Sequence, residues 1–220
     1  MAELKAILFD NDGTIVDTHD LLLATFRHTV RTVLGRDIPA EVLMAKVGLP
    51  LDTQMWDFTD DPAVHEALTA EFRRYNATIH DEMVTLFDGA AETLAALHAG
   101  GFKLGVVTSK RHAAARHGLE LLGVMQHFSC LVGADDFPEH KPQPGPVAHG
   151  AELLGVSPAE CLYVGDSPFD MQAGGGAGCA TVAALWGMFP EEVLREQHPS
   201  FVCERFADVL SIEPVAARLG

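Results

Sequence analysis

The stretch "AILFDNDGTIVD", residues 6–17, joins a short apolar run to a cluster of acidic residues. Its apolar part, within "LKAILF" at 4–9, predicts a short buried strand that ends at a turn. Asp10 and Asp12 stand one residue apart directly after this strand, and Asp17 follows soon after. Two carboxylates so close repel each other, so the chain either solvates them in a turn or uses them together.

A block of helices follows this first strand. Residues 15–84 contain no β-rich run and predict a small helical domain inserted into the chain. We expect a first helix that stops near Gly35 and a second from Pro39 to Gly48. The third should begin with Asp61 as its N-cap and Pro62 at the first helical position.

From residue 85 onward, strand and helix patterns alternate along the chain. Such alternation predicts an α/β fold, with a Rossmann-like parallel sheet and helices on both faces. The core domain would comprise residues 1–14 and 85–220, and the helical domain residues 15–84. The further expected strands lie at 102–107, 128–133, 161–165 and 179–185, and the expected helices at about 90–100, 111–122, 147–155 and 168–177.

The composition restricts the possible partners. Lys and Arg number 15 against 31 Asp and Glu, which gives a net charge of −16. This field repels nucleic acid and anionic lipid, so a phosphorylated ligand would need a local cation. No apolar stretch approaches the roughly 20 residues of a membrane span, and the N-terminus lacks the pattern of a secretory signal. We therefore expect a cytoplasmic protein whose four cysteines are reduced.

Polar side chains follow four of the predicted strands. Each one alone has a local explanation, as a turn residue, a helix cap or a solvated lysine. Ligands of open α/β sheets bind beyond the carboxyl ends of the strands, however, and there all of these side chains would meet. The residues are Asp10 and Asp12 after the first strand, Thr108, Ser109 and Lys110 after "LGVV", Lys141 in "HKPQPGP", and Asp166 and Asp170 after "LYVG".

These side chains suit phosphoryl chemistry. Carboxylate oxygens are hard ligands, which favours Mg²⁺ over zinc, and a lysine or hydroxyl can hold a phosphoryl oxygen. One aspartate can form an aspartyl phosphate, which divides a difficult hydrolysis into two steps. Its neighbour could protonate the leaving oxygen and later deprotonate water. That second task needs a pKa above the ordinary aspartate value of about 3.9.

At these residues the sequence resembles the phosphatases of the haloacid dehalogenase superfamily. The four motifs of that family are matched by "FDNDGTIVD", "VVTSK", "HKPQP" and "VGDSPFD", in order along the whole chain. Asn11 departs from the pattern, because an apolar residue usually separates the two aspartates. Asp12 argues against the dehalogenases and the transport ATPases of the superfamily, which lack an acid at this position.

The resemblance implies a role for each motif residue. Asp10 would be the nucleophile and Asp12 the general acid and base. Thr108 and Lys141 would bind the phosphoryl group, with Ser109 and Lys110 as further substrate contacts. Mg²⁺ would be held by Asp10, Asp166 and the backbone carbonyl of Asp12, with Asp170 nearby or joined through water. Residues 15–84 would form a cap over the site, and its loop 46–52 is predicted to face the substrate.

The substrate is predicted less closely than the chemistry. The sequence is most similar to the phosphoglycolate phosphatases and the small pyrophosphatases of the superfamily, which makes a small phosphorylated metabolite the expected partner and 2-phosphoglycolate the first candidate. Pyrophosphate, a phosphomutase reaction like that of β-phosphoglucomutase, and a non-catalytic acidic binding protein remain as alternatives. The oligomeric state is open. A cation of the helical domain near the site would favour a carboxylated substrate; the candidates are Arg27, Arg31, Lys46, Arg73 and Arg74.

Overall fold

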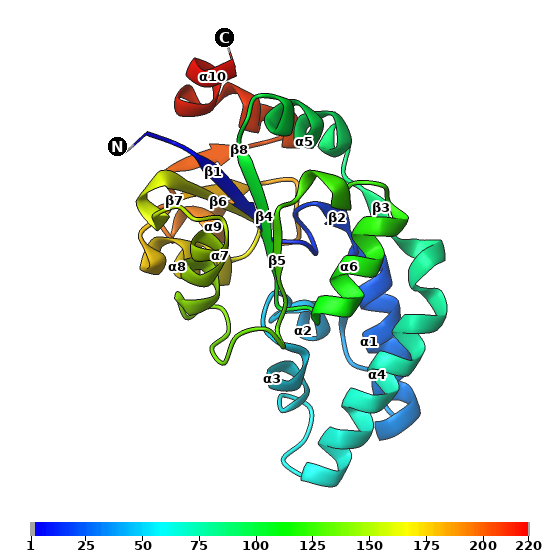
Figure 1. The fold of residues 1–220 in the computed structure, drawn as a ribbon. Helices are drawn as coiled ribbons and strands as arrows, with labels where there is room; N and C mark the ends of the chain where they lie inside the picture. Colours follow the sequence, from blue (N-terminus) through cyan, green and yellow to red (C-terminus); the bar gives the residue numbers. More distant parts are fainter. Residues whose placement is uncertain (1–2, 220) are drawn as a thin grey trace.

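The apolar run before Asp10 forms β1, a central strand of a six-stranded sheet. The computed structural model describes residues 3–219, and within them the sheet has the order β5-β4-β1-β6-β7-β8 with every neighbouring pair parallel (Figure 1). The fold is therefore α/β and Rossmann-like, as predicted. The strands are β1 (Ala6–Phe9), β4 (Lys103–Val107), β5 (Cys130–Val132), β6 (Cys161–Gly165), β7 (Ala180–Ala184) and β8 (Phe201–Cys203).

Helices cover both faces of the sheet, because the central strands are apolar on both sides. In β1, Ile7 and Phe9 pack in the cluster that contains residues of α5 and α6, whereas Ala6 and Leu8 pack in the cluster with α7 and α8. No helix within residues 3–219 is long and apolar enough to cross a membrane. The helices of this part are α5 (Ala90–Ala99), α6 (His112–Leu121), α7 (Gly145–Leu153), α8 (Pro168–Ala177), α9 (Glu191–Arg195) and α10 (Glu213–Leu219).

The predicted elements of the sheet are confirmed, with small shifts at their ends. Both β6 and α8 have the predicted bounds, whereas β5 is shorter than predicted and follows a 3₁₀ turn, Met125–His127. No strand or helix is predicted after residue 185. That segment holds the edge strand β8, α9, the 3₁₀ helix Phe206–Ser211 and α10.

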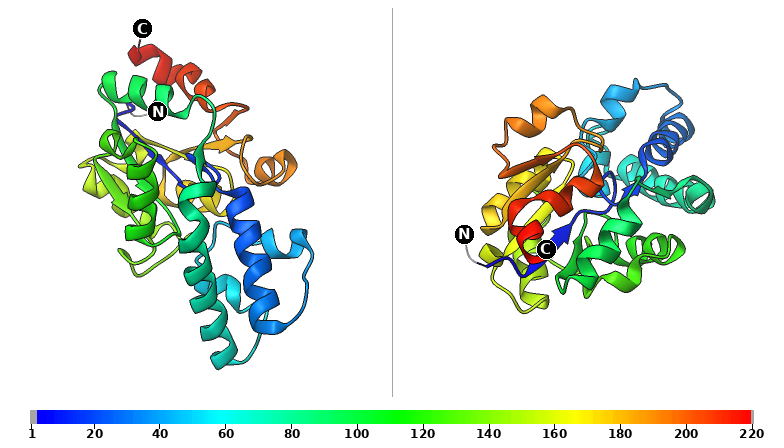
Figure 2. Two further views of the ribbon diagram at one scale, coloured as in Figure 1. Left: turned by 90° about the vertical axis from the view of Figure 1, so that its right-hand side faces the viewer. Right: turned by 90° about the horizontal axis from the view of Figure 1, so that it is seen from above.

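The helices α1 (His19–Leu34), α2 (Ala40–Met44), α3 (Leu51–Met55) and α4 (Pro62–Met83), which we call the helical block, extend away from the sheet (Figure 2). The block has its own apolar cluster, in which the rings of Phe26 and Phe72 lie 4.8 Å apart. Asp61 caps α4 by accepting a hydrogen bond from the amide of Ala63, as predicted. The prediction of one helix from Pro39 to Gly48 was wrong. The helix ends at Met44, and Gly48 has a φ of +104°, which a helix cannot accommodate.

Two short strands connect the block to the sheet. β2 (Val16–Asp17) and β3 (Thr85–Leu86) pair in antiparallel fashion, so the chain enters and leaves the block side by side. The carboxylate of Asp17 accepts a hydrogen bond from the amide of His19, the first residue of α1. Asp17 therefore has a structural contact at the start of the block and lies outside the acidic cluster described below.

Candidate active site

Three buried carboxylates meet at the carboxyl ends of β1 and β6. These strands pair in register, with Phe9 opposite Val164, so Asp10 and Asp166 follow directly at the same edge of the sheet. Asp170 comes from the first turn of α8. Carboxylate oxygens of Asp10, Asp166 and Asp170 lie within 4.8 Å of one another, and all three side chains are buried. The sequence-predicted juxtaposition of these residues is therefore present.

Lys141 lies between two of these carboxylates. Its Nζ is 2.8 Å from Oδ1 of Asp10 and 2.6 Å from Oδ1 of Asp170, and its side chain is buried. Burial alone would lower the pKa of Lys141, but the two carboxylates raise it above the ordinary value. The ammonium is therefore charged and holds the Asp10 carboxylate in a fixed place.

The charge of Lys141 does not balance all three carboxylates. Burial raises the pKa of Asp10 well above its usual range, although Lys141 opposes this shift. Burial also raises the pKa of Asp166 to about 7, and the nearby charge of Asp170 adds to the effect. The raised pKa values of both acids follow from burial of more negative charge than Lys141 offsets.

Asp170 is held on both of its oxygens. Oδ1 accepts a hydrogen bond from the Lys141 ammonium and another from the hydroxyl of Tyr163, at 3.0 Å. Oδ2 accepts hydrogen bonds from the amide and the hydroxyl of Ser167, at 3.0 and 2.5 Å. Asp170 therefore positions Lys141, and direct coordination of a metal by Asp170 stays a prediction. Sequence reasoning missed Tyr163, because a tyrosine within an apolar strand gives no signal beyond core packing.

Asp166 is positioned by two parts of the chain that are distant in sequence. Oδ1 accepts a hydrogen bond from the hydroxyl of Thr14 at 3.0 Å, and Oδ2 accepts one from the amide of Met188 at 2.8 Å. Gly13, with a φ of +85°, passes so close to the Asp166 carboxylate that a Cβ there would overlap it. The indole of Trp186 donates to the carbonyl of Thr14, which fixes the same turn. Sequence reasoning did not find the contributions of Trp186 and Met188.

The acidic cluster fits Mg²⁺. Its donors are all carboxylate oxygens, which Mg²⁺ prefers. Lys141 neutralises only one of the three carboxylates, and one divalent cation would offset the charge of the other two. Asp10 and Asp166 each have lone pairs beyond the hydrogen bonds described above, whereas those of Asp170 are largely used. We therefore expect Asp10 and Asp166 to be the side chains that hold the ion.

Asp12 lies beside the cluster and pairs with a different lysine. Its Oδ1 is 2.8 Å from Nζ of Lys110, and its Oδ2 accepts a hydrogen bond from the Asn11 amide at 3.1 Å. Burial raises the pKa of Asp12, but the Lys110 ammonium outweighs that effect and the pKa lies below the ordinary value. The pKa of Asp12 is thus not raised in this arrangement, as the role of general acid and base would need. The contact also gives Asn11 a role, because its amide orients Asp12.

The turn after β4 serves two purposes. Thr108 is buried, and its hydroxyl accepts a hydrogen bond from the Lys110 amide, which leaves the hydroxyl proton free to donate. Ser109 instead donates its hydroxyl to the carbonyl of Gly48 in the helical block, at 2.6 Å. A Cβ on Gly48 would lie 3.0 Å from Oγ of Ser167, so the loop 46–52 packs closely against the start of α8, and its facing the substrate stays a prediction. Ser109, predicted as a substrate contact, here connects the two parts of the chain.

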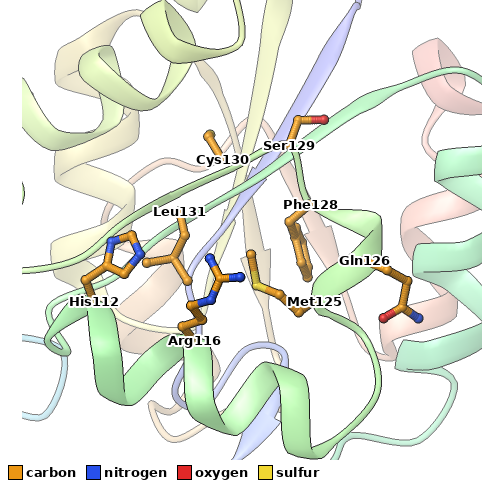
Figure 3. Close-up of a pocket in the computed structure, with 8 residues that line it drawn as sticks. All are labelled: His112, Arg116, Met125, Gln126, Phe128, Ser129, Cys130 and Leu131. Atoms are coloured by element: carbon orange, nitrogen blue, oxygen red, sulfur yellow. The ribbon is translucent and has the colours of Figure 1, made fainter.

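A separate hollow of about 410 Å³ lies at the edge of the sheet, between α6 and β5 (Figure 3). None of the predicted site residues lines it. Figure 3 shows Arg116 beside this hollow, and its guanidinium also pairs with Glu120. The hollow is therefore distinct from the acidic cluster. Its lining residues are His112, Arg116, Met125, Gln126, Phe128, Ser129, Cys130 and Leu131.

Comparison with known proteins assigns the family. Residues 7–184 match the family described as haloacid dehalogenase-like hydrolase. The chain belongs to this family. A protein of Caldanaerobacter subterraneus subsp. tengcongensis is 38% identical over 210 residues, which cover 96% of this chain and 94% of the relative. The pyrophosphatase PpaX of Anoxybacillus flavithermus is 35% identical over 216 residues, which cover 98% of this chain and 99% of the relative.

A solved structure supports the same assignment. The predicted phosphoglycolate phosphatase from Haemophilus somnus is 28% identical, with a TM-score of 0.89, and the match covers 97% of this chain and 99% of that chain. The resemblance noted in the sequence is thus confirmed, and this haloacid dehalogenase-like hydrolase is a phosphatase of its superfamily. The roles of its individual site residues stay predictions.

The buried position of Lys141 leads to a prediction about stability. In a Lys141→Met variant the carboxylates of Asp10 and Asp170 lose their buried counter-charge, and we expect the free energy of unfolding to fall by about 3–5 kcal/mol. Urea denaturation followed by circular dichroism measures this change. Lys5→Met is the matched control, since Lys5 pairs with Glu160 at the surface. A loss no larger than that of the control would contradict the assigned role of Lys141.

The contact between Ser109 and Gly48 leads to a second prediction. Ser109→Ala removes a hydrogen bond worth about 1 kcal/mol, so amide hydrogen exchange in the loop 46–50 should become about fivefold faster. Mass spectrometry of peptides from the loop measures the rate. Ser129→Ala, at an exposed serine before β5, serves as the control. Unchanged exchange together with a raised KM would show instead that Ser109 contacts the substrate.

Proposed function

We propose that this chain is a Mg²⁺-dependent phosphohydrolase that acts through an aspartyl phosphate on Asp10, with pyrophosphate as its first candidate substrate. The observation that carries the proposal is the arrangement around Asp10. Its carboxylate is buried, held by Lys141 at 2.8 Å, and lies within 4.8 Å of a second carboxylate at Asp166. A nucleophile in such a place is oriented and shielded from water.

The first step transfers the phosphoryl group to Asp10. An Asp10 oxygen attacks phosphorus, and the bond from phosphorus to the leaving oxygen breaks. Asp12 gives its proton to that oxygen. Lys141 and the Thr108 hydroxyl stabilise the charge on the phosphoryl oxygens. In the second step Asp12 accepts a proton from water, the water oxygen attacks phosphorus, and the Asp10 carboxylate is released with inorganic phosphate.

Lys110 links substrate binding to this proton transfer. While its ammonium contacts Asp12, the Asp12 carboxyl is held ionised and has no proton to give. An anionic leaving group would compete for the ammonium and draw it from Asp12. Asp12 could then hold a proton at neutral pH, when the leaving oxygen needs one.

Asp10, Asp166 and the backbone carbonyl of Asp12 would hold the Mg²⁺ ion. When bound, the ion supplies charge neutralisation and Lewis acidity toward the phosphoryl oxygens. Within the chain itself, Thr14 and the Met188 amide orient Asp166, and Asp170 orients Lys141. The helical block would act as a cap whose loop 46–52 excludes water from the site.

The choice of pyrophosphate rests on the relatives and on nearby cations. Relatives named pyrophosphatase PpaX are 32–35% identical over nearly the whole chain. Burial lowers the pKa of Arg73 in α4 and the guanidinium of Arg111, next to Lys110, lowers it further, whereas the Asp52 carboxylate raises it. Neither arginine forms an ion pair within residues 3–219. Two unpaired guanidinium groups, one from the block and one from the core, suit a leaving group with its own negative charge.

The second candidate substrate is 2-phosphoglycolate. Its leaving group carries a carboxylate, which the same cations would attract. The similarity to the predicted phosphoglycolate phosphatase of Haemophilus somnus supports this candidate. Pyrophosphate remains the preferred proposal, because the relatives named pyrophosphatase have the higher sequence identity.

A phosphate-release assay tests the proposed function. We expect Mg²⁺-dependent release of inorganic phosphate from pyrophosphate, which stops when EDTA is added. Asp10→Asn should lower kcat by about 10³-fold or more, because it removes the nucleophile. Asp17→Asn is the matched control and should retain activity, since the Asp17 carboxylate accepts a hydrogen bond from the amide at the start of α1 and lies outside the acidic cluster. Equal activity of Asp10→Asn and the unmodified protein would overturn the covalent mechanism, and release of phosphate distinguishes hydrolysis from phosphomutase activity.

The position of Arg73 allows a test of the substrate class. Arg73→Ala should raise KM about tenfold or more for pyrophosphate and 2-phosphoglycolate, because a charged contact to the leaving group is lost. The same change should leave the KM for p-nitrophenyl phosphate nearly unaltered. Arg74→Ala is the control, since the adjacent Arg74 pairs with Glu71 on the surface of α4. Equal effects of Arg73→Ala on all three substrates would contradict this assignment.

A further inference from the structure

A second cluster of metal-ligating side chains lies outside the acidic site. It consists of His80 and Asp81 at the end of α4 and His117 in α6, so it joins the helical block to the core domain. The contact between Asp81 and His117 connects the C-terminal end of α4 to α6. The proposed hydrolysis uses none of these residues.

The three side chains converge on one point. Oδ1 of Asp81 is 2.8 Å from Nδ1 of His80 and 2.8 Å from Nε2 of His117. One ligand atom from each residue lies within 4.8 Å of the other two. Ligand atoms bound to one metal at about 2.0–2.2 Å are separated by distances of this order. Small movements of the side chains would therefore suffice for all three to bind a single ion.

The surroundings keep the cluster in place and leave it accessible. The side chain of His80 is only 7% exposed and packs beside Gly118. Asp81 and His117 are 55% and 58% exposed, so an ion from solvent can reach them and water can complete its coordination. No lysine or arginine within residues 3–219 forms an ion pair with Asp81.

We propose that His80, Asp81 and His117 form a binding site for a divalent transition metal of the zinc type, which joins the base of the helical block to α6. Two imidazole nitrogens and one carboxylate oxygen suit Zn²⁺, Co²⁺ or Ni²⁺, whereas Mg²⁺ prefers oxygen ligands alone. The site therefore differs in metal preference from the acidic cluster around Asp10. Metal in this site would stabilise the contact between α4 and α6.

A second histidine pair provides an internal comparison. The rings of His98 and His127 lie 5.6 Å apart, and so do the rings of His80 and His117. Within the described residues, the His80–His117 pair forms a metal-ligating cluster with a carboxylate, whereas the His98–His127 pair belongs to no such cluster. A site that depends on the Asp81 carboxylate should therefore bind metal where the His98–His127 pair does not.

Titration with Co²⁺ tests the proposal on the full chain with Mg²⁺ in excess. The unmodified protein should bind about one Co²⁺ per chain with visible absorption of a four- or five-coordinate ion, and its Tm should rise. His117→Ala should weaken this binding at least about tenfold and abolish the rise in Tm. His98→Ala, the matched control, should behave as the unmodified protein.

Two results would overturn the site. One is that the unmodified protein binds no Co²⁺ when Mg²⁺ is present in excess. The other is Co²⁺ binding that His117→Ala leaves unchanged, whether or not His98→Ala weakens it. Since His117 is exposed, its replacement should leave the chain folded, and circular dichroism of the variant checks this. Asp81→Asn provides an independent variant that retains hydrogen-bonding capacity but lacks the anionic ligand.

Discussion

The buried ion pairs of Lys141 are the constraint on which the site depends. An ammonium or a carboxylate buried alone is costly, and the cost is offset only when each charge has well-placed partners. Here the partners come from three places in the chain: Asp10 after β1, Asp170 in the first turn of α8, and Lys141 in the loop before α7. These charges can be satisfied only if β1 and β6 are neighbours in register, so the active-site chemistry and the sheet topology require each other.

The distribution of charge explains how an acidic chain can bind phosphate. The net charge of −16 repels anions at long range, and three carboxylates concentrate negative charge at the strand ends. Two ammonium groups contact the aspartates that follow β1: Lys141 pairs with Asp10, and Lys110 pairs with Asp12. A divalent cation at Asp10 and Asp166 would complete this local reversal of charge.

The sequence predicts those features that depend on nearby residues, and misses those that depend on the tertiary fold. Asp10, Thr108 and Asp166 could be located because each follows a strand whose apolar pattern is clear, and parallel strands bring their ends together. The low pKa of Asp12 could not be predicted, because it depends on where the long Lys110 side chain points. The same holds for the Met188 amide, which reaches Asp166 from a segment without a recognisable motif. The interruption at Gly48 was missed because helical spacing says nothing about a positive φ.

Two hydrogen bonds between the helical block and the core lie at different distances from the strands that connect them. At the loop, a single hydrogen bond joins Ser109 to the Gly48 carbonyl. At the base, Asp81 and His117 join α4 to α6 close to the point where the chain returns through β3. A rotation of the block about β2 and β3 would move the distant loop through a large arc and the base through a small one. The loop contact would therefore break first, and a metal at the base would steady the pivot without blocking access to Asp10.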